Sequence, residues 1–190
     1  MMNWYWVIDC DNSVDDPLVA DQVELHGIDE WMLRTGRPLT DWNPEVTFYA
    51  SSPKWDGEPD DVLQNALGAP VYSPRLQDAL NLAGIEGIQY LPVRVCHADG
   101  VEVPGYALAN IINLVACLDW EKAEYRRWKG RPGQVRSITH LVVKGDALRG
   151  YDIVRMKEFP VKILASQKFV DVFLRNRFTG YSFAQLTDIT

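Results

Sequence analysis

Short hydrophobic segments separated by turn residues run along most of the chain, and their spacing predicts more strands than helices. The first is residues 4–9 (WYWVID), which is rich in β-forming side chains and leads into a turn-prone segment at 11–17. Further strands are predicted at 46–50, 88–95, 106–119, 137–145, 152–156 and 161–166, with 181–186 as a closing edge strand. The Asp-Gly pair at 99–100 predicts a hairpin between two of these strands.

Two segments carry the start and stop signals of helices. Ser73 precedes a proline, which predicts an N-cap followed by the first helical position, and Gly84 is placed to end that helix. Ser166 is placed to cap a second helix that runs to about Arg177, and Gly180 supplies a positive φ after it. Residues 18–35 favour short helix and loop equally, while five prolines between residues 38 and 70 exclude a long helix.

The order of these elements predicts an α+β fold, a mainly antiparallel or mixed sheet with a few covering helices. A chain of 190 residues with 47% hydrophobic and 11% aromatic residues suits one globular domain spanning 1–190. Within it, residues 1–70 form a loop-rich, proline-punctuated part and residues 71–190 the α+β body.

Charge is distributed unevenly between these two parts. Residues 1–70 carry 14 Asp and Glu against 3 Lys and Arg, whereas the remainder of the chain carries 12 against 16. The net charge of −7 argues against nucleic acid as a partner, because phosphate binding needs concentrated cations. An acidic first third instead suits electrostatic steering toward a basic protein.

Several features predict a cytoplasmic protein without a membrane anchor. No apolar run approaches the roughly 20 residues that a membrane span requires, and the N-terminal segment lacks the basic region of a secretory signal. The three cysteines, Cys10, Cys96 and Cys117, are widely spaced beside apolar residues, which suits buried thiols in a reducing compartment.

No motif with catalytic or metal-binding spacing is present, so no catalytic residue, metal or cofactor is expected. The acidic cluster around Asp11, Asp15 and Asp16 lacks the glycine and distal glutamate of an EF-hand loop, which favours a solvated turn. The adjacent Cys96 and His97 have no further ligands near them, and neighbours on a strand point to opposite faces.

Residues 120–136 are predicted to form an exposed excursion in which basic and aromatic residues alternate. Its members include Arg126 and Trp128, of the residue types that anchor protein interfaces and also of those that bind nucleic acid. A third interpretation is a solvated loop whose tryptophans pack back onto the sheet.

From residue 72 onward, an ordered series of motifs resembles a known family. The series runs from YSPRLQDAL through GIEGIQYLPV and YALANIINLVACLD to YDIVR and FTGYSF. Over residues 72–184 it is similar to immunity-protein family eleven, a set of bacterial proteins associated with polymorphic toxin systems. The resemblance implies a cytosolic protein that binds and neutralises a cognate toxin without enzymatic activity.

The leading hypothesis is therefore an immunity protein that binds its toxin through exposed acidic and aromatic side chains. The candidate partner-binding residues are Asp11, Asp15, Asp16, Trp42, Trp55, Asp60, Asp61, Arg126, Trp128 and Arg155. Arg155 qualifies only if it is exposed, since a buried arginine needs a carboxylate partner. The alternatives are a small-ligand enzyme or sensor whose pocket combines His140, Asp152, Arg155 and Tyr106, and a homo-oligomer or scaffold that docks through residues 120–136.

Overall fold

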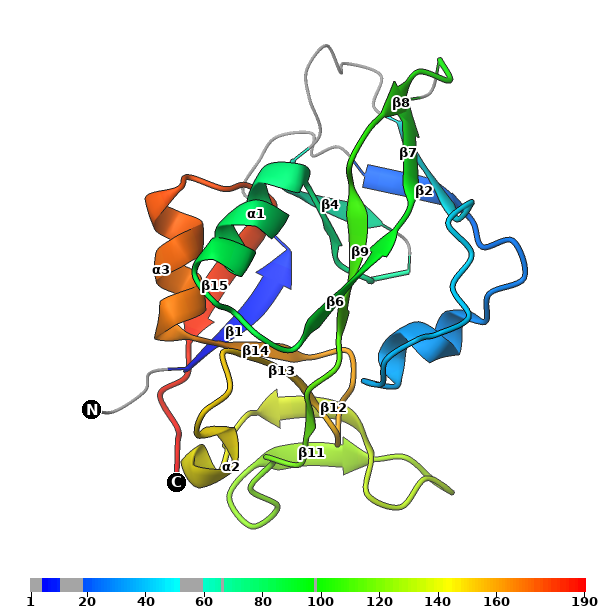
Figure 1. Cartoon of the computed structure of the whole chain (residues 1–190). Coiled ribbons are helices and arrows are strands. Elements are labelled where there is room, and N and C mark those ends of the chain that lie inside the picture. The colour runs from blue at the N-terminus through cyan, green and yellow to red at the C-terminus, as the bar shows by residue number, and fades with distance from the viewer. Residues whose placement is uncertain (1–4, 11–18, 52–59, 66, 98) are drawn as a thin grey trace.

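The computed structural model describes residues 5–10, 19–51, 60–65, 67–97 and 99–190. Within these ranges the chain forms two mixed sheets, a two-stranded hairpin and a few short helices (Figure 1). Most neighbouring strands are antiparallel, which confirms the predicted α+β class with a mainly antiparallel or mixed sheet.

The first sheet has five strands and contains both the first and the last strand of the structure. Its order is β10 (Leu114–Val115), β13 (Ile153–Met156), β14 (Ile163–Ser166), β1 (Tyr5–Cys10) and β15 (Tyr181–Gln185). Only the β10–β13 pair is parallel. The final strand lies at the edge of this sheet, as its position in the sequence predicted.

The second sheet has eight strands and joins the acidic first third to the rest of the chain. Its order is β6 (Ile88–Pro92), β9 (Ala107–Ile111), β5 (Val71–Tyr72), β4 (Val62–Asn65), β2 (Val19–Glu24), β3 (Thr47–Ser51), β7 (Arg94–His97) and β8 (Glu102–Val103). The pairs β2–β4 and β3–β7 are parallel. Because β3 pairs with β7 and β4 with β5, the three strands from before residue 70 lie between strands from after it in one sheet.

Helices α1 (Pro74–Leu82) and α3 (Gln167–Arg175) lie side by side, and both begin as predicted (Figure 1). Ser73 accepts a hydrogen bond from the backbone N–H of Leu76, and Ser166 accepts one from that of Phe169, so each serine satisfies an otherwise unpaired donor. The apolar faces of the two helices pack into one core with residues of both sheets. The two sheets are therefore held together by a shared hydrophobic core.

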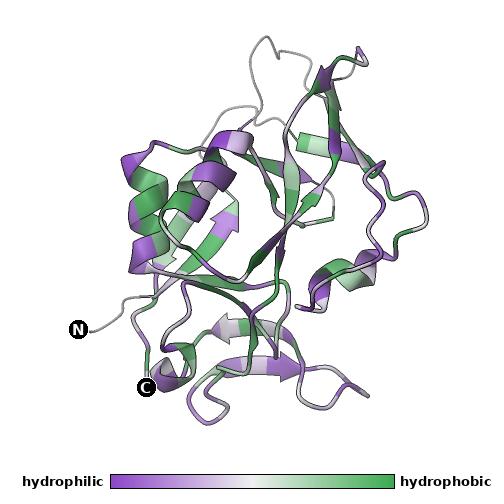
Figure 2. Cartoon of the chain, in the orientation of Figure 1, coloured by the Kyte–Doolittle hydropathy of each residue, from purple (hydrophilic) through white to green (hydrophobic). Residues whose placement is uncertain are grey.

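Residues 120–136 differ from the predicted excursion, because they contain the first strand of a hairpin and the start of the second. Its strands are β11 (Glu124–Arg127) and β12 (Val135–His140), which pair with irregular register. Figure 2 shows hydrophilic residues along β11, in contrast to the largely hydrophobic middle of α3. Tyr125 nevertheless packs edge-on against Trp120, and both contact the core beneath, so two of the three aromatic residues of this segment cover the core and only Trp128 does not.

Other boundaries also shift. Residues 18–35 contain strand β2 and the short 3-10 helix η1 (Glu30–Arg34), capped by Asp29. The strand predicted at 88–95 divides into β6 and β7, which belong to different ends of the eight-stranded sheet, and the hairpin near Gly100 joins β7 to β8. The strand predicted at 137–145 ends at His140, and helix α2 (Gly145–Leu148) follows.

Candidate functional site

A groove of about 690 Å³ lies where η1, the β11–β12 hairpin and the connection from β13 to β14 meet. Its lining contains five cationic side chains but no aspartate or glutamate, together with two tryptophans. The cations are Arg34, Arg37, Arg131, Arg136 and Lys157, and the tryptophans are Trp31 and Trp128. We refer to it as the basic-aromatic groove, and its composition suits anionic groups that also offer apolar contact.

Arginine and tryptophan side chains join the two walls of the groove. The guanidinium of Arg131 lies 5.4 Å from the ring centre of Trp31 on η1 and 5.5 Å from that of Trp128 on the hairpin. Arg136 lies 5.7 Å from the Trp128 ring. These distances are within the range of cation–π attraction, so the two indoles and the guanidiniums orient one another. Trp31 and Trp128 remain 52% and 45% exposed, which leaves much of both rings available for contact.

The five cations of the groove differ from several other cations of the molecule in their partners. Elsewhere, Arg75 binds Asp61, Lys162 binds Asp9 and Lys168 binds Asp152. Among the residues that the structure describes, none of the five groove cations forms an ion pair with a carboxylate. The positive potential of the groove is therefore not neutralised by the neighbouring side chains.

Arg155 lies behind the groove wall and adds a further positive charge. Its side chain is only 2% exposed, and its guanidinium donates to the carbonyl of Pro160, which lines the groove. The Nε atom has no hydrogen-bond partner within the described part of the chain. Burial lowers the pKa of Arg155 to about 10, although the nearby Tyr181 opposes this effect. At neutral pH the residue is thus a buried cation to which no carboxylate of the described residues is paired.

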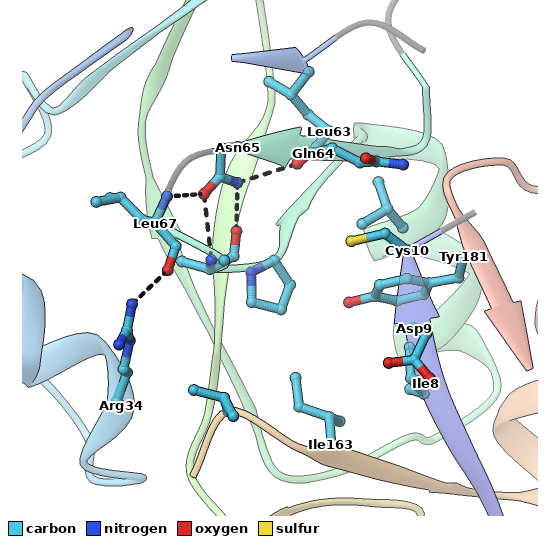
Figure 3. Close-up of a pocket in the computed structure, with 15 residues that line it drawn as sticks. Ile8, Asp9, Cys10, Arg34, Leu63, Gln64, Asn65, Leu67, Ile163 and Tyr181 are labelled. Carbon is cyan, nitrogen blue, oxygen red and sulfur yellow. Dashed lines mark hydrogen bonds between the residues drawn. The ribbon is translucent and has the colours of Figure 1, made fainter. Parts of the chain in front are cut away.

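A smaller pocket of about 290 Å³ adjoins the groove, and Figure 3 shows the residues that line it. Arg34 and Val161 line both hollows. The Nη2 atom of Arg34 donates to the carbonyl of Leu67 at 3.0 Å, and the Asn65 amide holds this turn by accepting from the Leu67 and Ala69 N–H groups (Figure 3). The β4–β5 turn therefore positions one of the groove cations.

The opposite side of this pocket carries Asp9, Cys10 and Tyr181 (Figure 3). Cys10 is exposed, in contrast to the buried thiol that its sequence neighbours predicted, whereas Cys96 and Cys117 are buried. Partial burial of the Cys10 thiol and the adjacent Asp9 carboxylate both raise its pKa. This shift is opposite to the one that activates a cysteine nucleophile.

The acidic and aromatic residues predicted to bind a partner are scattered. Asp11, Asp15, Asp16 and Trp55 lie outside the described residues, and Asp60 and Trp42 are half-buried. The Trp42 indole donates to the carbonyl of Pro92 at 2.7 Å and packs against the core of the eight-stranded sheet. Much of the Trp42 side chain is thus engaged in contacts within the chain.

Asp61 has a structural environment and is not an exposed acidic residue. It is 5% exposed and accepts hydrogen bonds from Ser73, from two nitrogens of Arg75 and from the backbone N–H of Thr179. Burial raises its pKa, but the hydrogen bonds from Arg75, Ser73 and Thr179 outweigh burial and leave the pKa below its ordinary value. Its carboxylate is satisfied within the chain.

The three basic and aromatic candidates have different positions. Trp128 lines the groove, and Arg126 is exposed on β11 of the same hairpin without lining it. Arg155 is buried, contrary to the condition for an interface residue, and Pro160 takes the place of the expected carboxylate partner. The hairpin is the part of the predicted surface that the structure brings to the groove.

The four residues of the alternative small-ligand pocket are held by separate partners. His140 faces Asp188 at 3.7 Å on the exposed side of β12, and Asp152 accepts from Ser166 and Lys168. Tyr106 packs in the core of the eight-stranded sheet and donates to the Asp60 carbonyl. These contacts do not bring the four side chains to one cavity.

Sequence reasoning missed the η1 side of the groove. Trp31, Arg34 and Arg37 belong to the acidic first third, where they read as parts of a segment without clear periodicity. One feature of the sequence could have indicated this part of the groove. Arg34 and Arg37 are two of only three cations in residues 1–70 and are close to a tryptophan in sequence. Their contact with the hairpin depends on chain folding between residues far apart in sequence.

The described residues contain neither a metal-binding cluster nor a membrane-spanning helix. No group of three or more His, Cys, Asp or Glu side chains there is arranged to hold a metal ion. No helix in the described ranges is long and apolar enough to cross a membrane.

Comparison with known proteins identifies a family. The model of an immunity protein family (Imm11) matches residues 8–188, which includes most of the acidic first third as well as residues 72–184. No curated protein matches the chain. The family match therefore confirms the resemblance seen in the motifs and extends it over nearly the whole chain.

Proposed function

Because the chain belongs to the immunity protein family Imm11, we propose that it binds a cognate bacterial toxin and neutralises it by protein–protein contact. The family match over residues 8–188 is the observation that carries this proposal. We further propose that it acts in the cytoplasm of the cell that it protects. The proposed activity is binding, and no catalytic step is assigned to any residue.

The chemistry of the described surface supports this proposal. The basic-aromatic groove is lined with arginine and tryptophan, the residue types that dominate the binding energy of protein interfaces. The candidate catalytic side chains, His140 and Asp152, are instead held apart by partners of their own.

A co-expression experiment tests the proposal. The probe is the C-terminal toxin domain encoded beside the gene for this chain, induced in a bacterial host with and without the chain. We expect growth to be restored only when both proteins are present, and a stable complex to elute as one peak in size-exclusion chromatography. An unrelated toxin serves as the control, and its toxicity should persist.

Two results would contradict the proposal. Failure to protect, with no complex formed by the purified proteins, would remove the immunity role for this toxin. Protection without a detectable complex, accompanied by a covalent change in the toxin seen by mass spectrometry, would instead establish an enzymatic mechanism.

A further inference from the structure

We infer that the basic-aromatic groove is the toxin-docking surface, and that its occupant is an acidic segment of the toxin. This inference rests on the proposed function and names the surface and the partner chemistry. The segment carries at least two Asp or Glu side chains beside an apolar residue. Its carboxylates bind Arg131 and Arg136, and its apolar side chain contacts the exposed indoles.

The charge distribution supports an anionic occupant. The molecule has a net charge of −7, yet the groove lining holds five cations and no carboxylate. Two of the three cations in residues 1–70, Arg34 and Arg37, are among them. Arg155 adds a buried positive charge behind the wall. No carboxylate of the described residues pairs with these cations, so the groove attracts an external anion.

The exposed hydrophobic groups support a polypeptide occupant. Of nine large hydrophobic residues that are exposed in the described chain, Trp31, Trp128 and Val161 all line the groove. An occupant that covers these three side chains needs an apolar side chain beside its own carboxylates. A protein loop supplies one, and a free carboxylate does not. A volume of about 690 Å³ accommodates a few side chains, as a loop tip presents them.

Nucleic acid fits the same surface less well. Arginine and tryptophan also bind single strands, but such proteins offer a basic path along many phosphates. Here the net charge of the whole molecule is negative, which repels a polyanion at long range while a single acidic loop can still enter the groove.

The decisive experiment reverses two groove charges in the full-length chain. The variant R131E/R136E changes two exposed arginines that lie on the Trp128 ring. We expect the dissociation constant for the purified toxin domain to rise roughly 100-fold, because close interfacial charge pairs are strongly coupled. The wild-type complex should also weaken between 50 mM and 300 mM salt, and the variant should lose much of this dependence.

The matched control is R149E/R175E, which makes the same change in net charge. Both control arginines are highly exposed, pair with nearby helical carboxylates and lie outside the groove. We expect this variant to bind within about threefold of the wild type, since exposed pairs contribute little. Circular dichroism and the unfolding midpoint establish that both double variants are folded. If R131E/R136E alone proves unfolded, R131Q/R136Q replaces it, with a smaller loss of affinity expected.

Each remaining outcome bears on one proposal or the other. If the wild type protects and binds but the two double variants bind equally well, the groove inference fails while the proposed function stands. If the wild type neither binds nor protects, the proposed function itself fails. Two outcomes would overturn the toxin segment as occupant. One is tight binding of a single-stranded 20-nucleotide oligonucleotide that R131E/R136E abolishes. The other is a dimer of the wild-type chain that this variant converts to a monomer.

Discussion

At the scale of single residues, the backbone conformation and the surroundings of Gly180 both favour glycine at this position. It has a φ of +97°, and a Cβ atom there would collide with the carbonyl oxygen of Val62. We expect G180A to lower the free energy of unfolding by about 3 kcal/mol or more, since the left-handed conformation and the steric conflict add. The matched control is G27A, whose φ is +90° with open space around it, and we expect a loss of about 1 kcal/mol. Urea denaturation measures both, and equal losses would show that the backbone relieves the Gly180 conflict.

At the scale of elements, Asp61 connects three parts of the chain. It precedes β4, accepts from the N-cap of α1 and from Arg75, and accepts from Thr179 just before β15. Asn at this position offers one acceptor and places an NH₂ group opposite existing donors, so D61N should lower the free energy of unfolding by about 2 kcal/mol at pH 7. D78N, on the exposed side of α1, is the control and should change it by less than about 0.5 kcal/mol.

The pKa of Asp61 gives this prediction a dependence on pH. Because its pKa is lower in the folded than in the unfolded protein, the stabilisation is complete above the unfolded value near 4. It is lost as pH falls through the folded pKa, so the difference between wild type and D61N should shrink steadily below pH 4. Unfolding curves from pH 7 to 2.5 measure this, and a difference that stays constant would mean that Asp61 is not ionised in the folded state.

The elements also show which parts of the structure were predictable. Helices α1 and α3 were predicted because caps and 3.6-residue periodicity are local signals, and Ser73 and Ser166 carry them directly. Strand β11 was missed because its exposed face is charged and its register is irregular, which removes the alternation that identifies strands. The groove was only half predicted, since the hairpin residues stood out but the contact of Arg131 with Trp31 joins segments that no local pattern relates.

At the scale of the whole molecule, Arg155 links the stability of the sheet to the charge of the groove. It lies on β13 between β10 and β14, buried with its Nε atom unpaired within the described residues. A folded pKa of about 10, against 12.5 for the free group, corresponds to a destabilisation of roughly 3 kcal/mol that persists at all pH values below about 10. Buried charges of this kind are often replaced by hydrophobic residues without loss of stability.

We therefore expect R155M to unfold at the same or a higher temperature than the wild type, because methionine removes the buried charge and keeps much of the side-chain volume. The same variant should bind the toxin on the order of tenfold more weakly. The reason is that a positive charge behind the groove wall is lost, and protein, not water, lies between that charge and the groove. M156L, a buried neutral change on the same strand, should preserve both properties. Calorimetry measures the unfolding temperature, and binding measurements on the same preparations give the affinity for the toxin, so the two effects are distinguished. A large loss of stability in R155M would show that the hydrogen bond from the guanidinium to the Pro160 carbonyl outweighs the cost of burying the charge. Unchanged affinity would show that the buried charge has no part in docking. A stable variant with weakened binding would show that the fold tolerates an internal charge that serves recognition at its surface.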